Sequence, residues 1–507
     1  MISRFLSWLF GASSSGHGPN WDPDGEKEGG GEPRVPSAAP AESAANGESL
    51  KSIRDGSPPI AREMPAGEIR AKKSVEQKLP SGPVAKPPTN EPLDLDIGLD
   101  VGTACSKAVI GNRELNEHTA VPINGGRNLA GYLLPSRVYL DAGSYSLVGT
   151  PGAVTRTNLK IRLIHAGIRA THPSEAGPIH DLVAFTALTL RRILEWHSEK
   201  LAPNQFGRVV SWNLNVGLPS KGNANDPFES IYRQIVGAAV ILAPGKSPIT
   251  QELITATLAQ PRDADWLPHG HIHYYPEAAA QLASLVFSPH CPAGCLLVVD
   301  VGAGTLDVST IRIGRNATEA QCNFNFCEVA PLGVHFLHLA RSGQVARNLD
   351  HAAFSRLIET IPNDDGDGAM SGKRAALPPA HFHEHCKEII MKNVVRYRRH
   401  LQNKHVKKRG FMPWTDGLPY VLSGGGCRDP YYQKLLNADL PQWLETVCSE
   451  WQSFSGMPKR GLQLRSFPAP KAFAPRVLAT DFDRFSVAHG LSLGVENLMR
   501  VSQTRID

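Results

Sequence analysis

Hydrophobic and polar positions follow two kinds of pattern along this chain. Short apolar runs that end on an aspartate and a glycine-rich turn predict buried strands at 93–100 and 296–300. Longer segments with apolar side chains at helical spacing predict helices at 179–201, 231–242 and 276–286. Strands that alternate with helices in this way predict an α/β fold.

Two of the strands end in the same way. In LLVVDVGAGTLDV, residues 296–308, a strand ends on Asp300 before a glycine-rich turn and a second strand. LDLDIGLDVGTACSKAVIG, residues 93–111, repeats this order with Asp100. Small residues let backbone N–H groups approach phosphate oxygens closely, and an aspartate can hold a Mg²⁺-bound water. We therefore expect a duplicated fold whose halves clamp ATP phosphates and Mg²⁺, with a β-hairpin that binds no ligand as the alternative.

The two turns supply most of the candidate site residues. Thr305 can donate its hydroxyl to the terminal phosphate, so we expect it to act in catalysis together with Asp100 and Asp300, which hold Mg²⁺ through water. The candidate phosphate-binding residues are Gly102, Thr103, Lys107, Gly302, Ala303 and Gly304.

A third glycine-rich segment lies at YVLSGGGCRDP, residues 420–430. A strand is followed by three glycines, an arginine, and a proline that begins a helix, which suits a backbone that lies flat against a nucleoside. The residues expected to face the nucleoside are Gly424, Gly425, Gly426 and Arg428.

The order DxGTxxSK, DxGxGTxD and LSGGG resembles the actin, sugar-kinase and 70-kDa heat-shock ATPase superfamily. LPSRVYLDAGSYSLVG at 134–149, YPEAAA at 275–280 and FSVAHGL at 485–491 are similar to the heat-shock chaperone branch. The resemblance covers about residues 93–495. It implies a two-lobed, actin-like ATPase fold in which duplicated ribonuclease-H-like domains enclose an ATP cleft, and its ExxK spacing adds Lys387 to the nucleotide-binding candidates.

Composition and resemblance together divide the chain. Residues 1–10 form a short apolar amphipathic segment, and 11–92, rich in Pro, Gly, Ser and Ala, predict a disordered linker. The resemblance implies ATPase lobe I at 93–290, lobe II at 291–480, and a C-terminal helix at 481–507 that packs back on lobe I. The first ten residues, MISRFLSWLF, are too short to cross a membrane, so peripheral contact with a membrane interface, a frayed end and a partner-docking peptide are the alternatives.

Charge and cysteine content narrow the setting. The chain has 507 residues and a net charge of +5, an excess too small to argue for a specific nucleic-acid partner. Eight scattered cysteines and no cleavable signal peptide favour a cytoplasmic setting, at most peripheral to the inner face of a membrane. No run of eighteen apolar residues occurs, so we expect no membrane-spanning segment.

Two clusters raise the question of a metal. Cys322 and Cys327 lie in one predicted strand with an odd spacing, so we expect them to face opposite sides and to hold no zinc with Cys291 and Cys295. In HFHEHCKEII, His381 and His385 share a helix face near Cys386; a metal site and a solvated helix are the two interpretations.

One departure from the family concerns catalysis. The heat-shock branch has a lysine that reaches the γ-phosphate and pairs with a glutamate, and Ile161 and Tyr275 align with these positions. Either Lys160 or Arg162 takes over with Glu277, one pair being shifted relative to the other, or the γ-phosphate lacks its positive contact. Loss of a positioned cation slows hydrolysis even where binding is tight.

The resemblance implies a Mg²⁺-ATP-binding, slowly hydrolysing ATPase that acts as a conformational switch or chaperone-like factor for a protein partner. Because about one helix follows Gly490, we expect no counterpart of the family's peptide-binding domain in this chain. A catalytically weak ATP-binding scaffold, an actin-like filament protein and a sugar kinase are the alternatives.

Overall fold

The computed structural model describes residues 91–166, 176–205, 207–218, 227–260, 271–286, 294–315, 320–343, 377–405, 418–443, 463–465, 469–494 and 499–503. The predicted apolar segment at 1–10, nearly all of the predicted linker and Cys291 lie outside these residues. The described residues belong to one unit of the chain and form a mixed α/β structure with three sheets, which confirms the predicted α/β class.

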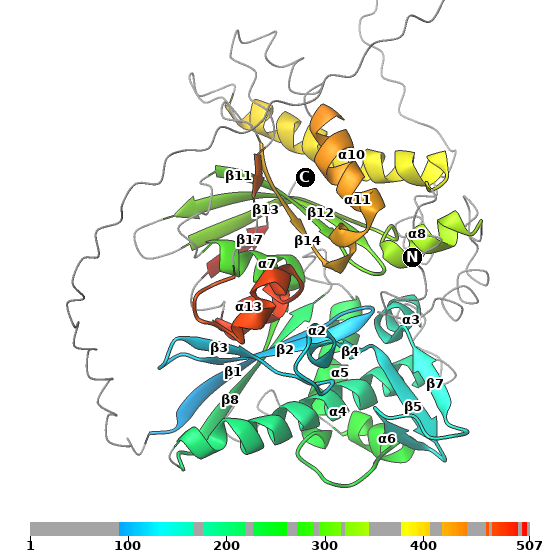
Figure 1. Cartoon of the computed structure of the whole chain (residues 1–507), viewed down its shortest axis with the longest axis vertical. Helices are drawn as coiled ribbons and strands as arrows, with labels where there is room; N and C mark the ends of the chain where they lie inside the picture. The colour runs from blue at the N-terminus through cyan, green and yellow to red at the C-terminus, as the bar shows by residue number, and fades with distance from the viewer. Residues whose placement is uncertain are drawn as a thin grey trace, which may run out of the picture. The chain divides into compact units, whose positions relative to one another are not determined.

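The first sheet is built on an antiparallel meander in which β2 lies between β1 and β3 (Figure 1). The other edge of β1 pairs in parallel with β8, which pairs in parallel with β10. Late in the chain, β16 pairs in parallel with β3. The strands are β1 (Leu93–Val101), β2 (Cys105–Asn112), β3 (Glu117–Ala120), β8 (Val210–Leu218), β10 (His271–Pro276) and β16 (Phe473–Ala474), and β4 (Leu134–Pro135) pairs with β2.

The second sheet has the same strand order. A meander of β11, β12 and β13 is extended on the β11 side by the parallel strands β14 and β15, and on the β13 side by the parallel strand β17. The strands are β11 (Gly294–Val301), β12 (Leu306–Arg315), β13 (Ala320–Ala330), β14 (Pro419–Ser423), β15 (Gln463–Arg465) and β17 (Met499–Gln503). Both predicted strand–turn–strand segments are therefore confirmed. Each supplies the first two strands of its sheet in chain order.

The third sheet is small and antiparallel, in the order β7 (Val154–Thr157), β5 (Arg137–Asp141), β6 (Ser144–Ser146) and β9 (Ile249–Thr250). The three predicted helices are confirmed as α4, α5 and α7. The helices that the argument uses are α3 (Leu159–Ala166), α4 (Ala176–Lys200), α5 (Pro227–Leu242), α7 (Glu277–Val286), α8 (Val334–Arg341), α10 (Ala380–His405), α11 (Pro430–Lys434) and α13 (Ser486–Ser492).

Helices cover both sheets and also lie between them (Figure 1). The apolar faces of α4 and α5 bury β1 and β8 of the first sheet, and α10 packs on β12 and β13 of the second. Between the sheets, α7 and α13 pack on each other, α13 on β1 and β2, and α7 against apolar residues of β11 and β12. None of the helices in the described ranges has the length and apolar character that crossing a bilayer requires.

Glycine sets how closely α13 approaches its neighbours. A Cβ atom on Gly490 would lie 1.7 Å from the carbonyl oxygen of Ala280 in α7. Cβ atoms on Gly98 of β1 and Gly111 of β2 would lie 2.0 and 2.2 Å from backbone oxygens of α13. Any side chain at these positions would push the helix away, so the close packing of α13 against α7, β1 and β2 depends on glycine.

The structure corrects the prediction of one C-terminal helix at 481–507. Helix α13 packs on β1 and β2 as expected, but it ends at Ser492, and Gly494 adopts a positive φ of 64°. After this turn β17 joins the second sheet. The chain also returns to the first sheet at β16, before residue 481.

The orientation predicted for two cysteines is wrong. A β-bulge shifts the register, because Thr310 pairs with Phe326 while Ile311 pairs with Phe324. The extra residue reverses the strand parity, and Cys322 and Cys327 pack against the same apolar cluster. Even so, no group of three potential metal ligands occurs among the described residues.

Candidate functional site

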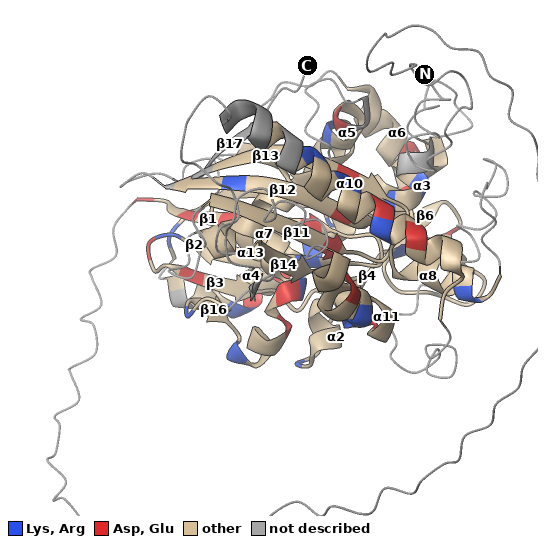
Figure 2. Ribbon diagram, turned by 90° about the horizontal axis from the view of Figure 1, so that it is seen from above, with Lys and Arg blue, Asp and Glu red and all other residues tan. Residues whose placement is uncertain are grey.

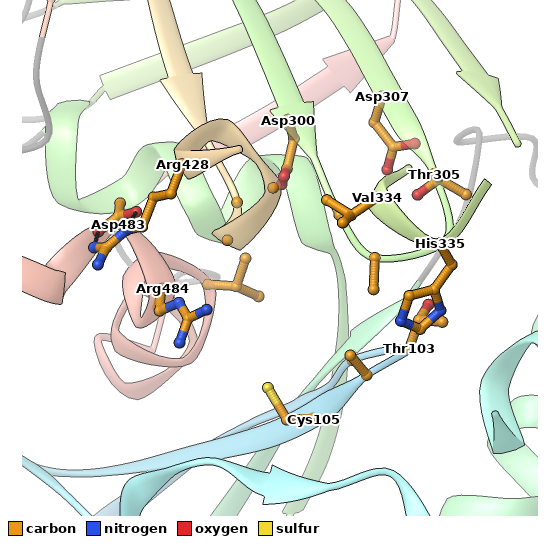
Figure 3. A pocket seen from close by; sticks show the side chains of 18 of the residues that line it. Thr103, Cys105, Asp300, Thr305, Asp307, Val334, His335, Arg428, Asp483 and Arg484 are labelled. Carbon is orange, nitrogen blue, oxygen red and sulfur yellow. Dashed lines mark hydrogen bonds and ion pairs between the residues drawn. The ribbon is translucent and has the colours of Figure 1, made fainter. Parts of the chain in front are cut away.

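A cavity of about 570 Å³ lies where the β1–β2 turn, the β11–β12 turn and the glycine segment after β14 converge (Figure 3). Its volume is in the range of small-molecule sites. The structure thus brings together three segments that are far apart in the sequence. The predicted site residues that line the cavity are Asp100, Gly102, Thr103, Lys107, Asp300, Gly302, Ala303, Thr305, Gly424, Gly425, Gly426 and Arg428.

Strand register decides which side chains meet beside each turn. Across β1 and β2, Asp100 lies opposite Lys107, and the two form an ion pair of 2.9 Å. Burial and the nearby charge of Arg484 lower the pKa of Lys107, but Asp100 raises it more strongly, so its pKa rises overall. Lys107 therefore stays protonated and neutralises Asp100.

The equivalent pair in the second hairpin consists of two acids. Across β11 and β12, Asp300 lies opposite Asp307. Burial raises the pKa of Asp300 to about 6, against a hydrogen bond of 2.5 Å that Gln281 donates to it. Burial and the charge of Asp300 raise the pKa of Asp307 to about 8, and its Oδ1 has no hydrogen-bond partner within the described part of the chain. The charge of Lys107 lowers the pKa of Asp300 and that of Lys160 lowers the pKa of Asp307, but burial outweighs both, so each acid holds its proton more strongly than a free aspartic acid does.

The β11–β12 turn is held by the start of α8. The backbone N–H groups of Val334 and His335 donate to the carbonyl oxygens of Gly302 and Ala303, at 3.1 and 2.8 Å. A Cβ atom on Gly333 would lie 2.5 Å from the oxygen of Ala303, so this contact also needs glycine. These bonds direct the carbonyl groups of the turn toward α8 and fix its conformation.

The expected lysine–glutamate pair occurs in shifted form. Lys160 of α3 and Glu277 at the start of α7 form an ion pair of 2.6 Å, and both line the cavity. Burial raises the pKa of Glu277, while Lys160 lowers it. Of the two shifted alternatives, Arg162 is excluded, because it pairs instead with Asp181 at 2.8 Å.

The aligned residues Ile161 and Tyr275 are part of the core. Ile161 is 7% exposed and packs with the apolar residues of β11 and β12, and Tyr275 is 5% exposed in the cluster between the sheets. Neither lines the cavity. The ion pair instead uses Lys160, one residue before Ile161, and Glu277, two residues after Tyr275, which is one of the shifted pairings expected above.

Gly304 does not face the cavity, although its sequence context predicted a phosphate ligand. A Cβ atom there would lie 2.8 Å from Cδ1 of Ile161 and 3.3 Å from Cγ2 of Thr103. The glycine is needed because the second hairpin packs closely against α3 and the first hairpin.

The three glycines after β14 differ from one another. A Cβ atom on Gly424, whose φ is 81°, would lie 2.1 Å from Oδ1 of Asp300, and one on Gly426 would lie 2.7 Å from the backbone oxygen of Val301. Both glycines are thus required by the protein's own packing. At Gly425 the nearest atom is Nη2 of Arg484, at 3.2 Å, which is the end of a flexible side chain. Gly425 is therefore the position where backbone is open to a ligand.

The two arginines at this end of the cavity are differently placed (Figure 3). Arg428, the predicted nucleoside contact, pairs with Asp481 and, at 2.6 Å, with Asp483. Arg484 points toward the cavity and lies over Gly425.

Lys387 does not reach the cavity. Its Nζ lies 3.8 Å from Glu384 and 5.2 Å from the ring centre of Trp443. Helix α10 carries both acidic and basic side chains (Figure 2), and its Lys392 and Arg396 pair with Glu328.

The histidine cluster of α10 does not form a metal site within the described residues. Cys386 is fully buried in the core of the second sheet, and burial raises the pKa of its thiol to about 12. It therefore lies away from the partly exposed His381 and His385, as expected for a helix with one buried face and one solvated face.

Several cavity residues were not among the predicted ligands. Gln281 directly follows the YPEAAA segment, and Asp307 is the last acid of the DxGxGTxD motif, yet neither was assigned a role from the sequence. His335 lies beside Thr305 and Thr103, and burial lowers its pKa to about 4, so its imidazole is neutral at pH 7. No local motif marks His335 or Arg484, because their positions depend on how distant segments pack.

The residues present fit Mg²⁺ bound through water better than a direct metal cage. Asp100, Asp300, Asp307 and Glu277 line the cavity beside the two turns together with Lys107 and Lys160, so the carboxyl groups outnumber the lysines there. No three carboxylates are close enough to hold an ion among the described residues. Mg²⁺ commonly keeps several waters and uses one or two carboxylates together with phosphates. A scan of the chain against protein-family models found no match, and a search of curated proteins found none either.

Proposed function

We propose that this protein binds Mg²⁺-ATP in the cavity between its two large sheets and hydrolyses it slowly. The observation that carries the proposal is the convergence of two like hairpins and a glycine segment on one cavity with excess carboxylate. The Mg²⁺ of such a ligand would offset the charge of these carboxylates, and its phosphates would pair with the cations of the cavity, which neither a sugar nor an apolar ligand would do.

The fold we propose is the two-lobed actin-like ATPase fold with duplicated ribonuclease-H-like domains, in its heat-shock-70-like form. The shared strand order of the two sheets and the placement of α7 and α13 between them support it. Lobe I would centre on the first sheet and lobe II on the second. Lobe closure around ATP would be the conformational output that a protein partner reads.

The chain's own residues suit this reaction. Asp100 and Asp300 would hold metal-bound waters, Thr305 would donate to the terminal phosphate, and Lys160, held by Glu277, would contact the same group. Bound Mg²⁺ supplies positive charge to the phosphate chain. The Lys160–Glu277 pair favours an ATPase over a scaffold, since it supplies the cation whose absence was the reason to expect a pseudo-enzyme.

The test is titration calorimetry of the full chain with ATP and ADP in Mg²⁺, followed by single-turnover hydrolysis of γ-labelled ATP. Gly425→Val should abolish binding, because its side chain would occupy the open backbone face while displacing only the tip of Arg484. Gly314→Val is the matched control, since a side chain at Gly314 meets no atom within 4 Å and the residue lies outside the cavity.

Three outcomes are distinguishable. Binding with slow release of phosphate, lost in Gly425→Val and kept in Gly314→Val, is the expected result. Binding without turnover would leave the scaffold function. No binding by the wild type, or equal binding by both variants, would overturn the proposal.

A further inference from the structure

The positive charge at the glycine end of the cavity belongs to Arg484 rather than Arg428. The guanidinium of Arg428 is already used: Nη1 donates to Asp481, and Nη2 donates to Asp483 at 2.6 Å and to the carbonyl oxygen of Thr480 at 3.4 Å. Two carboxylates therefore neutralise Arg428, and its donors point toward residues 480–483. This leaves Arg428 little charge to offer a ligand.

Arg484 follows Asp483 directly but points the other way, toward the cavity (Figure 3). Its Nη2 and Nε lie 3.2 and 3.3 Å from the position of a Cβ atom on Gly425. No ion pair or hydrogen bond to Arg484 occurs within the part of the chain that the structure describes. Its guanidinium thus keeps its donors and its charge beside open backbone.

Arg484 also lies near the hairpin turns. Its charge acts on Lys107, the lysine that Asp100 neutralises, so Arg484 is the uncompensated member of this pair of cations. On the other side, Gly424 contacts Asp300, and Gly424 and Gly425 are consecutive, with Cα atoms about 3.8 Å apart. A ligand that crosses these two glycines therefore meets an acid that can hold Mg²⁺ and, next to it, a free guanidinium.

We propose that Arg484 is a phosphate-binding residue of this cleft, and that Arg428 is a positioning residue that holds it over Gly425 through Asp483. The ligand group is the phosphate chain of a nucleotide, because a planar guanidinium donates two parallel hydrogen bonds to phosphate oxygens. A nucleoside without phosphate offers no anion to this side chain. The inference rests on the proposed nucleotide-binding function and adds the residue that reads the charge of the ligand.

The test compares ADP with adenosine. Calorimetric titration of the full chain with Mg²⁺-ADP and, separately, with adenosine is made for the wild type and for Arg484→Gln. Loss of a charge-assisted phosphate contact should weaken ADP binding roughly 10- to 100-fold and leave adenosine binding unchanged. Arg484→Lys, which keeps the charge without the fork, should recover part of the loss.

The matched control is Arg476→Gln, the same substitution in the same segment, η5 (Arg476–Arg484). Arg476 is exposed, lies outside the cavity and donates to the carbonyl oxygen of Pro470 at 2.8 Å. Both ligands should bind this variant as they bind the wild type.

Arg428→Gln tests the positioning role. It should weaken ADP binding less than Arg484→Gln does, and adding it to Arg484→Gln should cost nothing more, since the two residues act through one contact. Equal losses for ADP and adenosine in Arg484→Gln, or an unchanged ADP affinity, would overturn the inference while the proposed function stands. Failure of the wild type to bind ADP would overturn both.

Discussion

The two hairpins share a backbone arrangement but differ in electrostatics. In both, an aspartate one residue before the end of the first strand lies opposite a charged residue near the start of the second strand. In the first hairpin that residue is Lys107, and the pair is neutral. In the second it is Asp307, so two acids lie side by side in the cavity wall. Burial raises the pKa of Asp300 to about 6 and the pKa of Asp307 to about 8.

This difference separates an acid that the protein neutralises itself from an acid pair that it does not neutralise. The Asp100–Lys107 pair is satisfied by the protein itself and needs no ligand for its stability. The Asp300–Asp307 pair is not, because burial of like charges costs free energy that only protonation or a cation can recover. Under the proposed function, the fold gives up some stability at this acid pair in exchange for a binding site.

The largest expected effect comes from replacing the matching aspartates one at a time. Asp300→Asn should lower single-turnover hydrolysis roughly 10²- to 10⁴-fold, because its charge acts on the attacking water as the transition state develops. Nucleotide affinity should change by less than about tenfold, which calorimetry measures on the same protein.

Asp100→Asn should instead lower stability. Lys107 would remain charged and largely buried without its partner, at a cost of about 3 kcal/mol in the free energy of unfolding, measured by urea denaturation. If Asp300→Asn hydrolyses ATP at the wild-type rate, or if both variants lose stability equally, the two hairpins do not differ in the way described.

The sequence predicted the hairpins because their chemistry is local. The strand, the acid and the glycine-rich turn occupy consecutive residues, so the pattern indicates both the structure and the residues beside the turn. Residues that reach the cavity from a distance were harder to assign. A shift of one residue in α3 exchanges the buried Ile161 for Lys160, and only the packing of α3 against the second sheet decides between them.

The roles of individual glycines and arginines also depend on packing between distant segments. Gly304 and Gly425 look alike in the sequence, yet one accommodates Ile161 and the other faces the cavity. Arg428 stands in the motif, but Asp481 and Asp483, distant in sequence, bind its guanidinium. Cys322 and Cys327 were misjudged because a β-bulge cannot be read from alternation alone.

The next effect in size is a pH dependence of stability, which we expect from the acid pair of the second hairpin. Burial raises the pKa of Asp307 from 3.8 to about 8, so the folded state holds a proton that the unfolded chain releases. Stability is therefore favoured below pH 4, falls as the pH rises, and stays low above pH 8. Asp307→Asn removes this penalty and should stabilise the ligand-free protein above pH 8, on the order of 1–3 kcal/mol in urea unfolding.

The control for this experiment is the same stability measurement made at acid pH. At pH 3 the aspartic acid is mostly protonated in both states, so Asp307→Asn should have almost no effect on stability there. A gain of the same size at both pH values would mean that Asp307 is destabilising for reasons of packing rather than charge.

The smallest expected effect is on nucleotide affinity. This affinity should rise with pH, whereas the stability of the ligand-free protein falls. If the Asp300–Asp307 wall faces Mg²⁺, bound nucleotide favours the ionised acids, and affinity for Mg²⁺-ATP should rise about tenfold between pH 7 and pH 9 as Asp307 loses its proton. The phosphates of ATP contribute little, because they are already ionised over this range.

Calorimetry in buffers of different ionisation enthalpy would detect the proton released on binding. In Asp307→Asn the affinity should be lower and nearly independent of pH over the same interval, and this variant should combine higher stability with weaker binding. A wild-type affinity that does not change from pH 7 to pH 9 would mean that the acid pair does not face the metal, and Asp100 would then be the aspartate to examine as its ligand.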